Sequence, residues 1–418
     1  MRLRNGKRIS LPLLGLFVVA GLALLAAGCS GAAPVGWSGP TLSQQTLYIG
    51  NPQGYLLALD IDNGTQRWAG KLTGDKRASI LGCAGPTQSS SAIYGTPAAS
   101  GELVYSTSYN GKVYAFGVAD GIEKWKYPLG NDLAHIVSGP VVVAGMVVFG
   151  NTDGKVYALD SANGTEKWTF KTEGKVWATP ATDEKTVYAP SLDGRVYALD
   201  ALTGSLIWKT EKIGGIIATP AVTADTVFVG SLDNSLYAFD KASGKEKWRF
   251  AGGNFFWAGP ILKDNLVVAA NTDGKVYGIE ITGGKQVWAS SVDGIISSTP
   301  TLADGSLIIG GNDGRLYVLD AATGKEVRAI LSGTSIQGPL ASSGSKVYVR
   351  TKEGDTTYIK GFDIKNGTPV LSAPLQAAIT STPASGQSSG SFNWQLIFIF
   401  ALMIAVVFLL MNRRPRKS

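Results

Sequence analysis

The sequence is poor in the side chains that most enzymes use for catalysis. It contains one histidine, His135, and two cysteines, Cys29 and Cys83. A histidine without a second histidine or a cysteine near it cannot complete a zinc site or act as general base for a nucleophile. We therefore expect His135 to be a surface or capping residue and the protein to be non-catalytic.

Calcium-binding acidic series are also missing. The turns at Asn151, Asn271 and Asn312 each contain an aspartate, but none continues into the regularly spaced acidic residues of a calcium loop. We interpret these segments as structural turns, and we expect no bound metal.

The central part of the chain lacks a net charge of either sign. The formal net charge is +7, but residues 2–8 and 413–417 contain four basic residues each. Removing these eight from the 38 Lys and Arg leaves 30, against 31 Asp and Glu. Because a nucleic-acid-binding domain is usually strongly basic, this composition argues against nucleic acid as a partner.

The N-terminal end has the pattern of an export signal. Basic residues are followed by an apolar segment from Leu11 to Ala27, and Ala27-Gly28-Cys29 resembles the processing site of bacterial lipoproteins. We expect residues 1–28 to be a signal peptide, Cys29 to be lipidated and residues 29–36 to be a tether. The alternative is an uncleaved signal anchor.

The C-terminal end predicts a transmembrane helix at residues 394–411. This apolar run has 18 residues, about 27 Å as a helix, which is enough to cross the hydrocarbon core. A Ser/Gly-rich linker, residues 385–393, precedes it, and a basic tail, residues 412–418, follows. The positive-inside rule keeps that tail in the cytoplasm. Both ends therefore predict a bacterial protein held at the cytoplasmic membrane, with its central region outside.

The central region repeats one motif. A clear copy covers residues 156–168, and seven clear copies and a degraded eighth end at Trp68, Trp125, Trp168, Trp208, Trp248, Trp288, Arg328 and Leu371. The four copies from Trp168 to Trp288 end 40 residues apart, and a small residue followed by proline precedes each unit. Short apolar strands and tight turns at this period indicate propeller blades. We predict an all-β, eight-bladed β-propeller of four-stranded antiparallel blades over residues 37–384.

Each unit is expected to contain four short strands. In the unit that ends at Trp248, these are residues 221–222, 226–230 and 236–240 and a short fourth strand ending at the tryptophan. Pairs such as Asp153-Gly154 separate the second strand from the third. They predict type I′ turns, in which both central residues have positive φ.

The spacing Ala-x-Asp-x-x-x-Gly-x-x-x-Trp resembles the tryptophan-docking motif of the quinoprotein-like (PQQ-repeat) eight-bladed propellers. It covers roughly residues 37 to 375, and one copy is Ala158/Asp160/Gly164/Trp168. The resemblance implies that each tryptophan packs against the next blade and locks the ring. The motif departs at Gly117, Glu280, Val318 and Gly361, as well as at Arg328 and Leu371. We therefore expect the ring seam, or a partner surface, near blades 7 and 8.

This family resemblance allows two functions. Similarity to the quinoprotein dehydrogenases would imply pyrroloquinoline quinone and calcium on the axis, beside a disulfide of adjacent cysteines. The sequence has no adjacent cysteines, and its loops are short. Similarity to the BamB-like branch implies a scaffold for envelope or membrane proteins. We interpret the chain as a monomeric, BamB-like scaffold without a cofactor, and the alternative is a PQQ- or other small-ligand-binding propeller.

Two features are candidates for recognition. The longest insertion, residues 71–94, contains Cys83 and either contacts a partner or has no function. Trp37, Tyr94, Trp177 and Trp257 each stand three residues before a repeated proline. If these aromatic residues face the central channel, they could stack on a flat or sugar-like ligand. If they face the adjacent blade they are core, which is the interpretation we favour.

Overall fold

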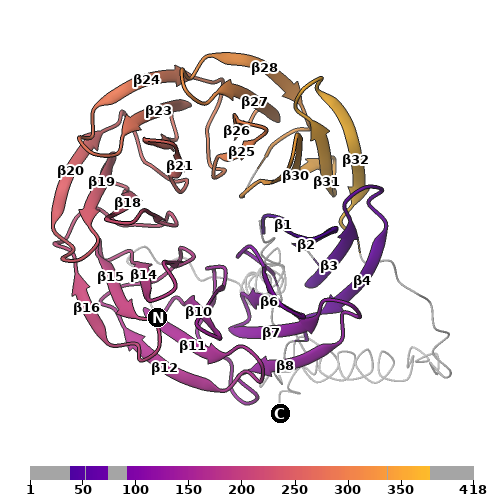
Figure 1. Ribbon diagram of the computed structural model, residues 1–418. Coiled ribbons are helices and arrows are strands. Elements are labelled where there is room, and N and C mark those ends of the chain that lie inside the picture. The colour runs from indigo at the N-terminus through magenta and orange to yellow at the C-terminus, as the bar shows by residue number, and fades with distance from the viewer. Residues whose placement is uncertain (1–37, 52, 74–91, 337, 377–418) are drawn as a thin grey trace, which may run out of the picture. The chain divides into compact units, whose positions relative to one another are not determined.

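The computed structural model describes residues 38–51, 53–73, 92–336 and 338–376. Across these ranges the strands form eight four-stranded antiparallel sheets, each built from four consecutive strands. The sheets are arranged as blades around a central axis (Figure 1). The predicted eight-bladed all-β propeller is therefore confirmed, whereas the predicted signal peptide and transmembrane helix lie outside the described residues.

The strands of the first four blades have the following bounds. Blade 1 contains β1 (Thr41–Ser43), β2 (Thr46–Gly50), β3 (Tyr55–Asp60) and β4 (Gln66–Lys71); blade 2 contains β5 (Ala98–Ser100), β6 (Leu103–Ser108), β7 (Lys112–Gly117) and β8 (Glu123–Tyr127); blade 3 contains β9 (Val141–Val143), β10 (Met146–Gly150), β11 (Lys155–Asp160) and β12 (Glu166–Lys171); blade 4 contains β13 (Ala181–Thr182), β14 (Thr186–Pro190), β15 (Val196–Asp200) and β16 (Leu206–Lys209).

The other four blades follow the same order from the axis outward. Blade 5 contains β17 (Ala221–Val222), β18 (Thr226–Gly230), β19 (Ser235–Asp240) and β20 (Glu246–Ala251); blade 6 contains β21 (Ile261–Lys263), β22 (Leu266–Ala270), β23 (Lys275–Glu280) and β24 (Gln286–Ser291); blade 7 contains β25 (Thr301–Ala303), β26 (Ser306–Gly310), β27 (Arg315–Asp320) and β28 (Glu326–Leu331); blade 8 contains β29 (Ala341–Ser343), β30 (Lys346–Glu353), β31 (Thr356–Asp363) and β32 (Thr368–Pro374).

Burial explains the different sequences of inner and outer strands. The second strand of blade 3, β10, is buried along its whole length, because neighbouring blades cover both of its faces. The outermost strand β12 is mostly exposed, and its buried residue is Trp168. The tryptophan was predicted to end this strand. Instead β12 and its counterpart β20 continue three residues past Trp168 and Trp248, pairing with the third strand of the blade.

Tryptophan–glycine contacts join most of the blades. Trp168 in blade 3 donates a hydrogen bond from Nε1 to the carbonyl of Ala201 in blade 4, at 3.0 Å. Gly204 of blade 4 lies over the indole ring, where an added Cβ would be 2.6 Å from Cδ2. Trp68, Trp125, Trp208 and Trp248 make the same bond to the following blade. Trp288 also lies beneath the next blade's glycine, but its Nε1 has no hydrogen-bond partner in the described part of the chain.

The alanine of the motif leaves room for the tryptophan within the same sheet. Ala158 pairs directly with Trp168, and the strand register shifts by one residue immediately after Ala158. Such a bulge increases the local twist of the outer strand. In blade 6 a glycine, Gly278, replaces the alanine, and a Cβ there would come within 2.2 Å of Trp288. Trp288 therefore fills the space that the alanine methyl group occupies beside the other docked indoles.

The aspartate of the motif caps the turn between the third and fourth strands. Oδ1 of Asp200 accepts hydrogen bonds from the amides of Leu202 and Thr203, as well as from the hydroxyl of Thr203. These bonds stabilise the carboxylate and lower the pKa of Asp200, with the Thr203 hydroxyl contributing most. In blade 2, where Gly117 replaces the aspartate, Asp120 accepts the amide of Ile122 instead.

The turns between the second and third strands are not of type I′. In blade 3, Gly154 has a positive φ of 81°, but Asp153 does not. The amide of Gly154 donates to the carbonyl of Asn151, so the tight turn begins one residue earlier than predicted. This pattern is a type I turn followed by a left-handed residue. The Asp-Gly pair indicated the hairpin correctly and its turn type wrongly.

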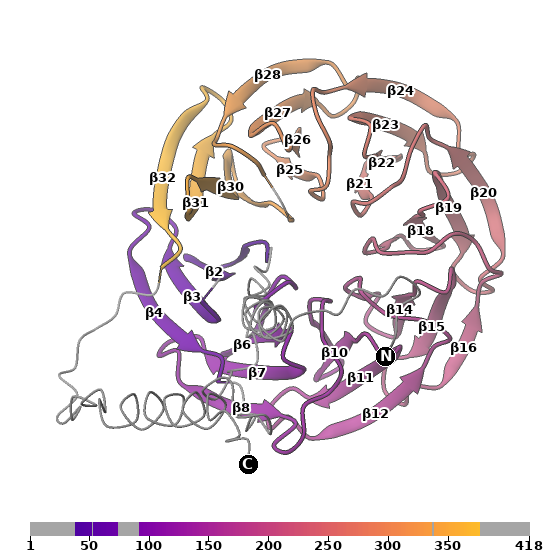
Figure 2. The same ribbon diagram turned by 180° about the vertical axis from the view of Figure 1, so that it is seen from behind.

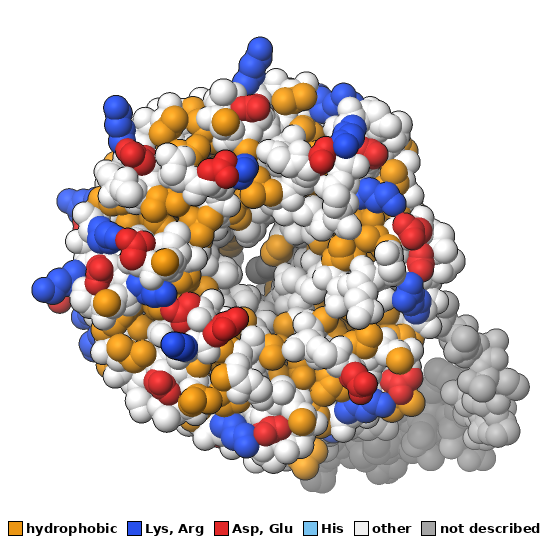
Figure 3. Space-filling model, viewed as in Figure 1, with side chains coloured by type: hydrophobic (Ala, Val, Ile, Leu, Met, Phe, Trp, Pro, Cys, Tyr) orange, Lys and Arg blue, Asp and Glu red, His pale blue; other side chains and the backbone are white. Residues whose placement is uncertain are grey.

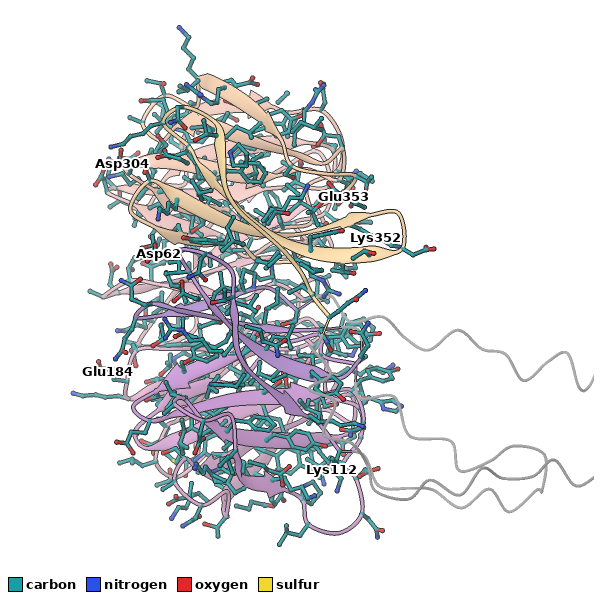
Figure 4. All side chains as sticks on the ribbon, turned by 90° about the vertical axis from the view of Figure 1, so that its right-hand side faces the viewer. Asp62, Lys112, Glu184, Asp304, Lys352 and Glu353 are labelled. Carbon is teal, nitrogen blue, oxygen red and sulfur yellow. The ribbon has the colours of Figure 1, made fainter. Side chains whose placement is uncertain are left out.

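The propeller has two distinct faces. The turn face carries the turns between the first and second strands and between the third and fourth strands of each blade. The loop face carries the turns between the second and third strands. Figure 1 views the turn face, and Figure 2 views the loop face from behind. In Figure 3 the turn face is hollowed at its centre, with charged side chains of both signs around the hollow. Figure 4 shows Asp62, Glu184 and Asp304 at the turn face and Lys112 and Lys352 at the loop face. The loop face also carries the segments that connect successive blades, whose residues hydrogen-bond to its turns.

The ring closes between blade 8 and blade 1. Both sheets are built from their own consecutive strands, and therefore no strand is exchanged to close the ring. Leu371 of blade 8 takes the tryptophan's place beneath Gly64 of blade 1 and joins a buried apolar cluster shared by both blades. The hydroxyl of Tyr348 donates to the carbonyl of Ile61 at 3.4 Å. The seam expected near blades 7 and 8 is thus located on the far side of blade 8.

The seam also contains a buried cation. Arg350 in β30 is only 6% exposed, and its Nη1 has no hydrogen-bond partner among the described residues. Burial lowers the pKa of Arg350 to about 10. Four other blades have glycine at this strand position: Gly50, Gly150, Gly230 and Gly310. The blade 8 to blade 1 interface therefore contains a buried charge at a strand position where these four blades have no side chain.

The tryptophan–glycine contact predicts a specific cost for Gly204→Ala. Backbone strain and steric overlap should both destabilise this variant, because Gly204 has a φ of 70° and its added Cβ would overlap Trp168. The matched control is Gly145→Ala, whose φ is 73° but whose Cβ would meet nothing within 4 Å. The control should lose about 1–2 kcal/mol of unfolding free energy, and Gly204→Ala about 1–3 kcal/mol more. Equal losses in denaturant titrations would contradict the docking role.

Candidate functional site

A cavity of about 540 Å³ lies on the propeller axis. It is lined mainly by the ends of the inter-blade segments, where each segment approaches the axis before the innermost strand. The lining residues are Tyr94, Gly95, Thr96, Tyr109, Val137, Gly139, Trp177, Ala178, Thr179, Ile217, Ala218, Thr219, Trp257, Ala258, Gly259, Ser297, Thr299, Gly338 and Pro339. Every blade from the second to the eighth contributes to this wall.

Three of the four predicted aromatic residues face this cavity. Tyr94, Trp177 and Trp257 all line it, and Trp257 is 43% exposed. The favoured interpretation, that they belong to the blade core, is therefore wrong for these three. The residue immediately before each of them fills the core instead, as Val176 does before Trp177. Because neighbouring residues of an extended segment point to opposite sides, the aromatic ring is left facing the axis. Trp37 lies outside the described residues.

A second tyrosine extends the aromatic wall on the blade 2 side. The rings of Tyr94 and Tyr109 have centroids 5.2 Å apart, and His135 stacks on Tyr109 at 4.1 Å with an interplanar angle of 4°. Nδ1 of His135 is 2.7 Å from the carbonyl of Tyr109. Burial, with a smaller contribution from Tyr109, raises the pKa of Tyr94. The expected surface position of His135 is confirmed, whereas Tyr109 was missed because it precedes an ordinary Asn-Gly turn.

The cavity wall contains no aspartate, glutamate, lysine, arginine or histidine among the described residues. Its polar side chains are mainly threonine, serine and tyrosine hydroxyls. Nε1 of Trp177 is buried, and among the described residues it has no hydrogen-bond partner. The hydroxyl oxygen of Thr179 accepts the amide of Gly139 at 2.9 Å. No group of three potential metal ligands occurs in the described part of the chain. This donor set does not fit calcium, which prefers carboxylate oxygens, or the quinone cofactor that resemblance to dehydrogenases would imply.

A buried lysine shapes the segment beside this wall. Lys112 at the start of β7 is fully buried, and its Nζ donates to the carbonyls of Pro128 and Gly130 at 3.0 and 3.3 Å. Nζ also lies 3.3 Å from Oδ1 of Asp132, whose side chain is nearly buried. A charge buried in this way is tolerated because several oxygens surround it. The ammonium group therefore organises the segment that leads to His135.

The outer strands divide into a charged group and an apolar group. The residue before the tryptophan is basic in blades 1, 2, 3 and 5, and each forms an ion pair: Arg67–Asp60, Lys124–Asp120, Lys167–Asp160 and Lys247–Asp225. In blades 6 and 7 this position, counted from Trp288 and Arg328, is Val287 and Val327, which are 57% and 61% exposed. Charged side chains protect a sheet edge against pairing with another strand. At this position the edges of blades 6 and 7, like that of blade 4 with Ile207, lack a charged side chain.

Exposed large apolar side chains are concentrated in the same part of the ring. Of the eleven such residues in the described ranges, six belong to blades 6 and 7 or to the segments that precede these blades. We call this set the blade 6–7 sector: Phe255, Trp257, Val287, Ile295, Val327 and Leu331. A smaller set, Leu202, Leu206 and Ile207, lies on blade 4. The partner surface expected near blades 7 and 8 stays a prediction, and the exposed apolar residues lie about one blade earlier in the ring.

Comparison with known proteins identifies the family. A family model described as outer membrane protein assembly factor BamB matches residues 30–169, 84–210, 152–294 and 253–391. The chain belongs to this family. The matches extend over the whole propeller of this BamB-family protein. No match was found among curated protein sequences.

Two solved structures resemble this BamB-family propeller in fold. One is the crystal structure of the computationally designed protein Ika8, with a TM-score of 0.64 and 20% identity, covering 77% of this chain and 94% of the other. Another is BamB from Moraxella catarrhalis, with a TM-score of 0.60 and 19% identity, covering 75% of this chain and 90% of the other. At this identity the likeness shows the fold alone.

Several predicted residues fall outside the described ranges. Cys29, Cys83 and the apolar run at 394–411 are among them, and so the lipidation, the recognition role of the insertion and the membrane span stay predictions. No helix in the described segments is long and apolar enough to span a membrane.

The buried ammonium group of Lys112 predicts a local loss of order in Lys112→Met. The nearly buried Asp132 and the two part-buried carbonyls would lose this donor, which should cost about 3 kcal/mol or more. Amide hydrogen exchange should accelerate in residues 128–135. Lys124→Met is the control, because its ion pair with Asp120 is about 40% exposed on each side and should contribute less than about 1 kcal/mol. Similar effects of the two substitutions would refute this role.

Proposed function

We propose that this protein is a non-catalytic, membrane-anchored scaffold that binds other envelope proteins on the outer side of the bacterial cytoplasmic membrane. Family membership supports a protein-binding role, because the matching model is described as an assembly factor. The observation that carries the proposal is the blade 6–7 sector, where apolar side chains are exposed on an otherwise well-packed ring. Exposed apolar surface of this kind is typical of interaction sites.

The sector offers two kinds of contact to a protein partner. Phe255, Trp257 and Ile295 belong to the inter-blade segments of the loop face, where aromatic and apolar residues can anchor a partner. Val287 and Val327 lie on the outermost strands β24 and β28. An extended segment of a partner can add to such an unprotected strand edge through main-chain hydrogen bonds. A partner that covers both surfaces would bind by loops and by a sheet edge together.

The proposed lack of catalysis rests on the chemistry of the axis. The axial cavity has no charged side chain in its described wall. The single histidine of the chain, His135, is stacked on Tyr109. The quinoprotein alternative needs carboxylate ligands at this place, and no residue of the described wall supplies one. We therefore assign neither a reaction nor a cofactor to the propeller.

Anchoring is proposed from the two ends of the chain. The apolar run at 394–411 and the basic tail that follows it support a membrane span with a cytoplasmic end. The N-terminal signal and Cys29 support export and a second, lipid anchor. A monomeric propeller attached in this way would present its loops and edges to partners in the envelope.

Photocrosslinking should detect the proposed partner at the blade 6–7 sector. A photoreactive phenylalanine analogue placed at Val287 or Val327 is expected to give a discrete covalent adduct in the membrane fraction of the native host. The matched control is Lys167, which holds the same strand position in blade 3. Ile295→Lys should weaken any adduct that also depends on the loop face. Identical adducts from all three positions, or no adduct from blades 6 and 7, would contradict the scaffold proposal.

The proposed topology predicts the labelling of two cysteine variants. In a Cys83→Ser background, Gly145→Cys on the propeller should react with a membrane-impermeant maleimide in cells whose outer layers are permeable to it. Lys417→Cys in the basic tail should react only after lysis, because the tail is expected to remain in the cytoplasm. Labelling of both positions before lysis, or of neither, would overturn this orientation.

A further inference from the structure

We infer that the axial cavity is a binding site for a neutral carbohydrate of one to three pyranose rings. This inference does not depend on the proposed scaffold function, because it rests on the described cavity wall alone. Three properties of that wall carry it: the lack of charge, the placement of the aromatic rings and the hydroxyl groups between them.

The absence of charge selects against ionic ligands. A carboxylate or phosphate that enters the cavity would lose its water without an opposite charge in the described wall, whose ionisable groups are two tyrosines. The ammonium group of Lys175, 5.7 Å from the centroid of the Trp177 ring, does not belong to that wall. Such desolvation is costly when no ion pair replaces the water. A metal ion would likewise find no carboxylate or imidazole ligand. A neutral ligand avoids both costs.

The aromatic rings surround the axis on three sides. Tyr94, Trp177 and Trp257 precede blades 2, 4 and 6, and so they recur at every second blade. In an eight-membered ring, blades 2 and 6 are opposite each other, and Tyr94 and Trp257 therefore stand across the axis. Aromatic faces suit flat apolar surfaces, including the C–H faces of a pyranose. Val137 and Ile217 separate them and add no polar group.

Hydroxyl groups complete the wall between and beside the rings. Thr96, Thr179, Thr219 and Thr299 occupy equivalent positions one residue before the repeated prolines, and Ser297 lies where blades 2, 4 and 6 have an aromatic ring. Thr179 accepts the amide of Gly139, so its O–H remains able to donate. Alternating hydroxyls and aromatic faces match the two kinds of surface on a sugar.

The size of the cavity is also suitable. Its volume of about 540 Å³ is within the range of about 300–1,000 Å³ that is usual for small-molecule sites. A purely apolar peptide side chain would leave the ring of hydroxyls without partners. A carbohydrate supplies both donors and acceptors to these groups, and for this reason we assign the cavity to a sugar rather than to a peptide.

Isothermal titration of the purified full-length protein, in a detergent without a sugar headgroup, tests this inference. The neutral probes are chitotriose, cellotriose and maltotriose, and the charged control is trigalacturonate. At least one neutral trisaccharide should bind saturably, with a Kd of about 1 mM or lower, and trigalacturonate should not bind. Failure of all three neutral probes up to about 20 mM, or equal binding of the charged one, would overturn the inference.

Substitutions then locate the site. Trp177→Ala and Trp257→Ala should each weaken binding about tenfold or more through loss of a stacking face. Trp177→Phe keeps a ring and lacks the N–H, and its effect should be smaller. Leu202→Ala on blade 4 is the control, and melting temperatures show whether each variant is folded. Unchanged affinity in folded tryptophan variants would overturn the assignment, as would tighter binding of a capped Gly-Trp-Gly peptide than of any sugar.

Discussion

The contact between an indole ring and a glycine of the following blade is the constraint on which the propeller depends. It explains three positions of the repeat together: the tryptophan fills the interface, the glycine allows its close approach, and the alanine opposite leaves room within the sheet. The indole N–H also pairs with a backbone carbonyl that would otherwise be buried near an apolar ring. A change at one of these positions therefore affects a whole blade interface, and the repeat tolerates little variation there.

The ring can close without strand exchange because the last interface has a different composition. Leu371 and its apolar neighbours replace the indole, and Tyr348 contributes a hydrogen bond to blade 1. Blade 7 uses Arg328 beneath Gly367 at its own interface with blade 8. Both sides of blade 8 thus lack the tryptophan–glycine contact. In a nearest-neighbour description of repeat stability, these two interfaces are where we expect the ring to open first.

Periodicity was sufficient to predict the fold, because each blade repeats the same steric solution. It predicted the eight blades, whereas the docking role of the tryptophans came from the family resemblance and the exposed position of His135 from the lack of a second histidine or a cysteine near it. It could not predict which of two adjacent apolar residues, such as Val176 and Trp177, faces the axis, because that choice depends on the segment's orientation in the closed ring. The turn type was also missed, because Asp-Gly pairs suit type I′ turns as well as a type I turn followed by a left-handed glycine.

Some positions of the repeat hold neighbouring blades together, which we call docking positions, and other positions are free to vary. This division explains where binding specificity can develop in this fold. Docking residues are held by packing on both sides, whereas the residue before each tryptophan is exposed and the residues facing the axis border the cavity. At these free positions the blades differ: lysine or arginine with an ion pair in some blades, valine in blades 6 and 7. The axis varies in the same way, from Trp177 through Ile217 to Ser297. An evenly repeated scaffold thereby acquires one apolar sector and one uneven cavity without any loss of its interfaces.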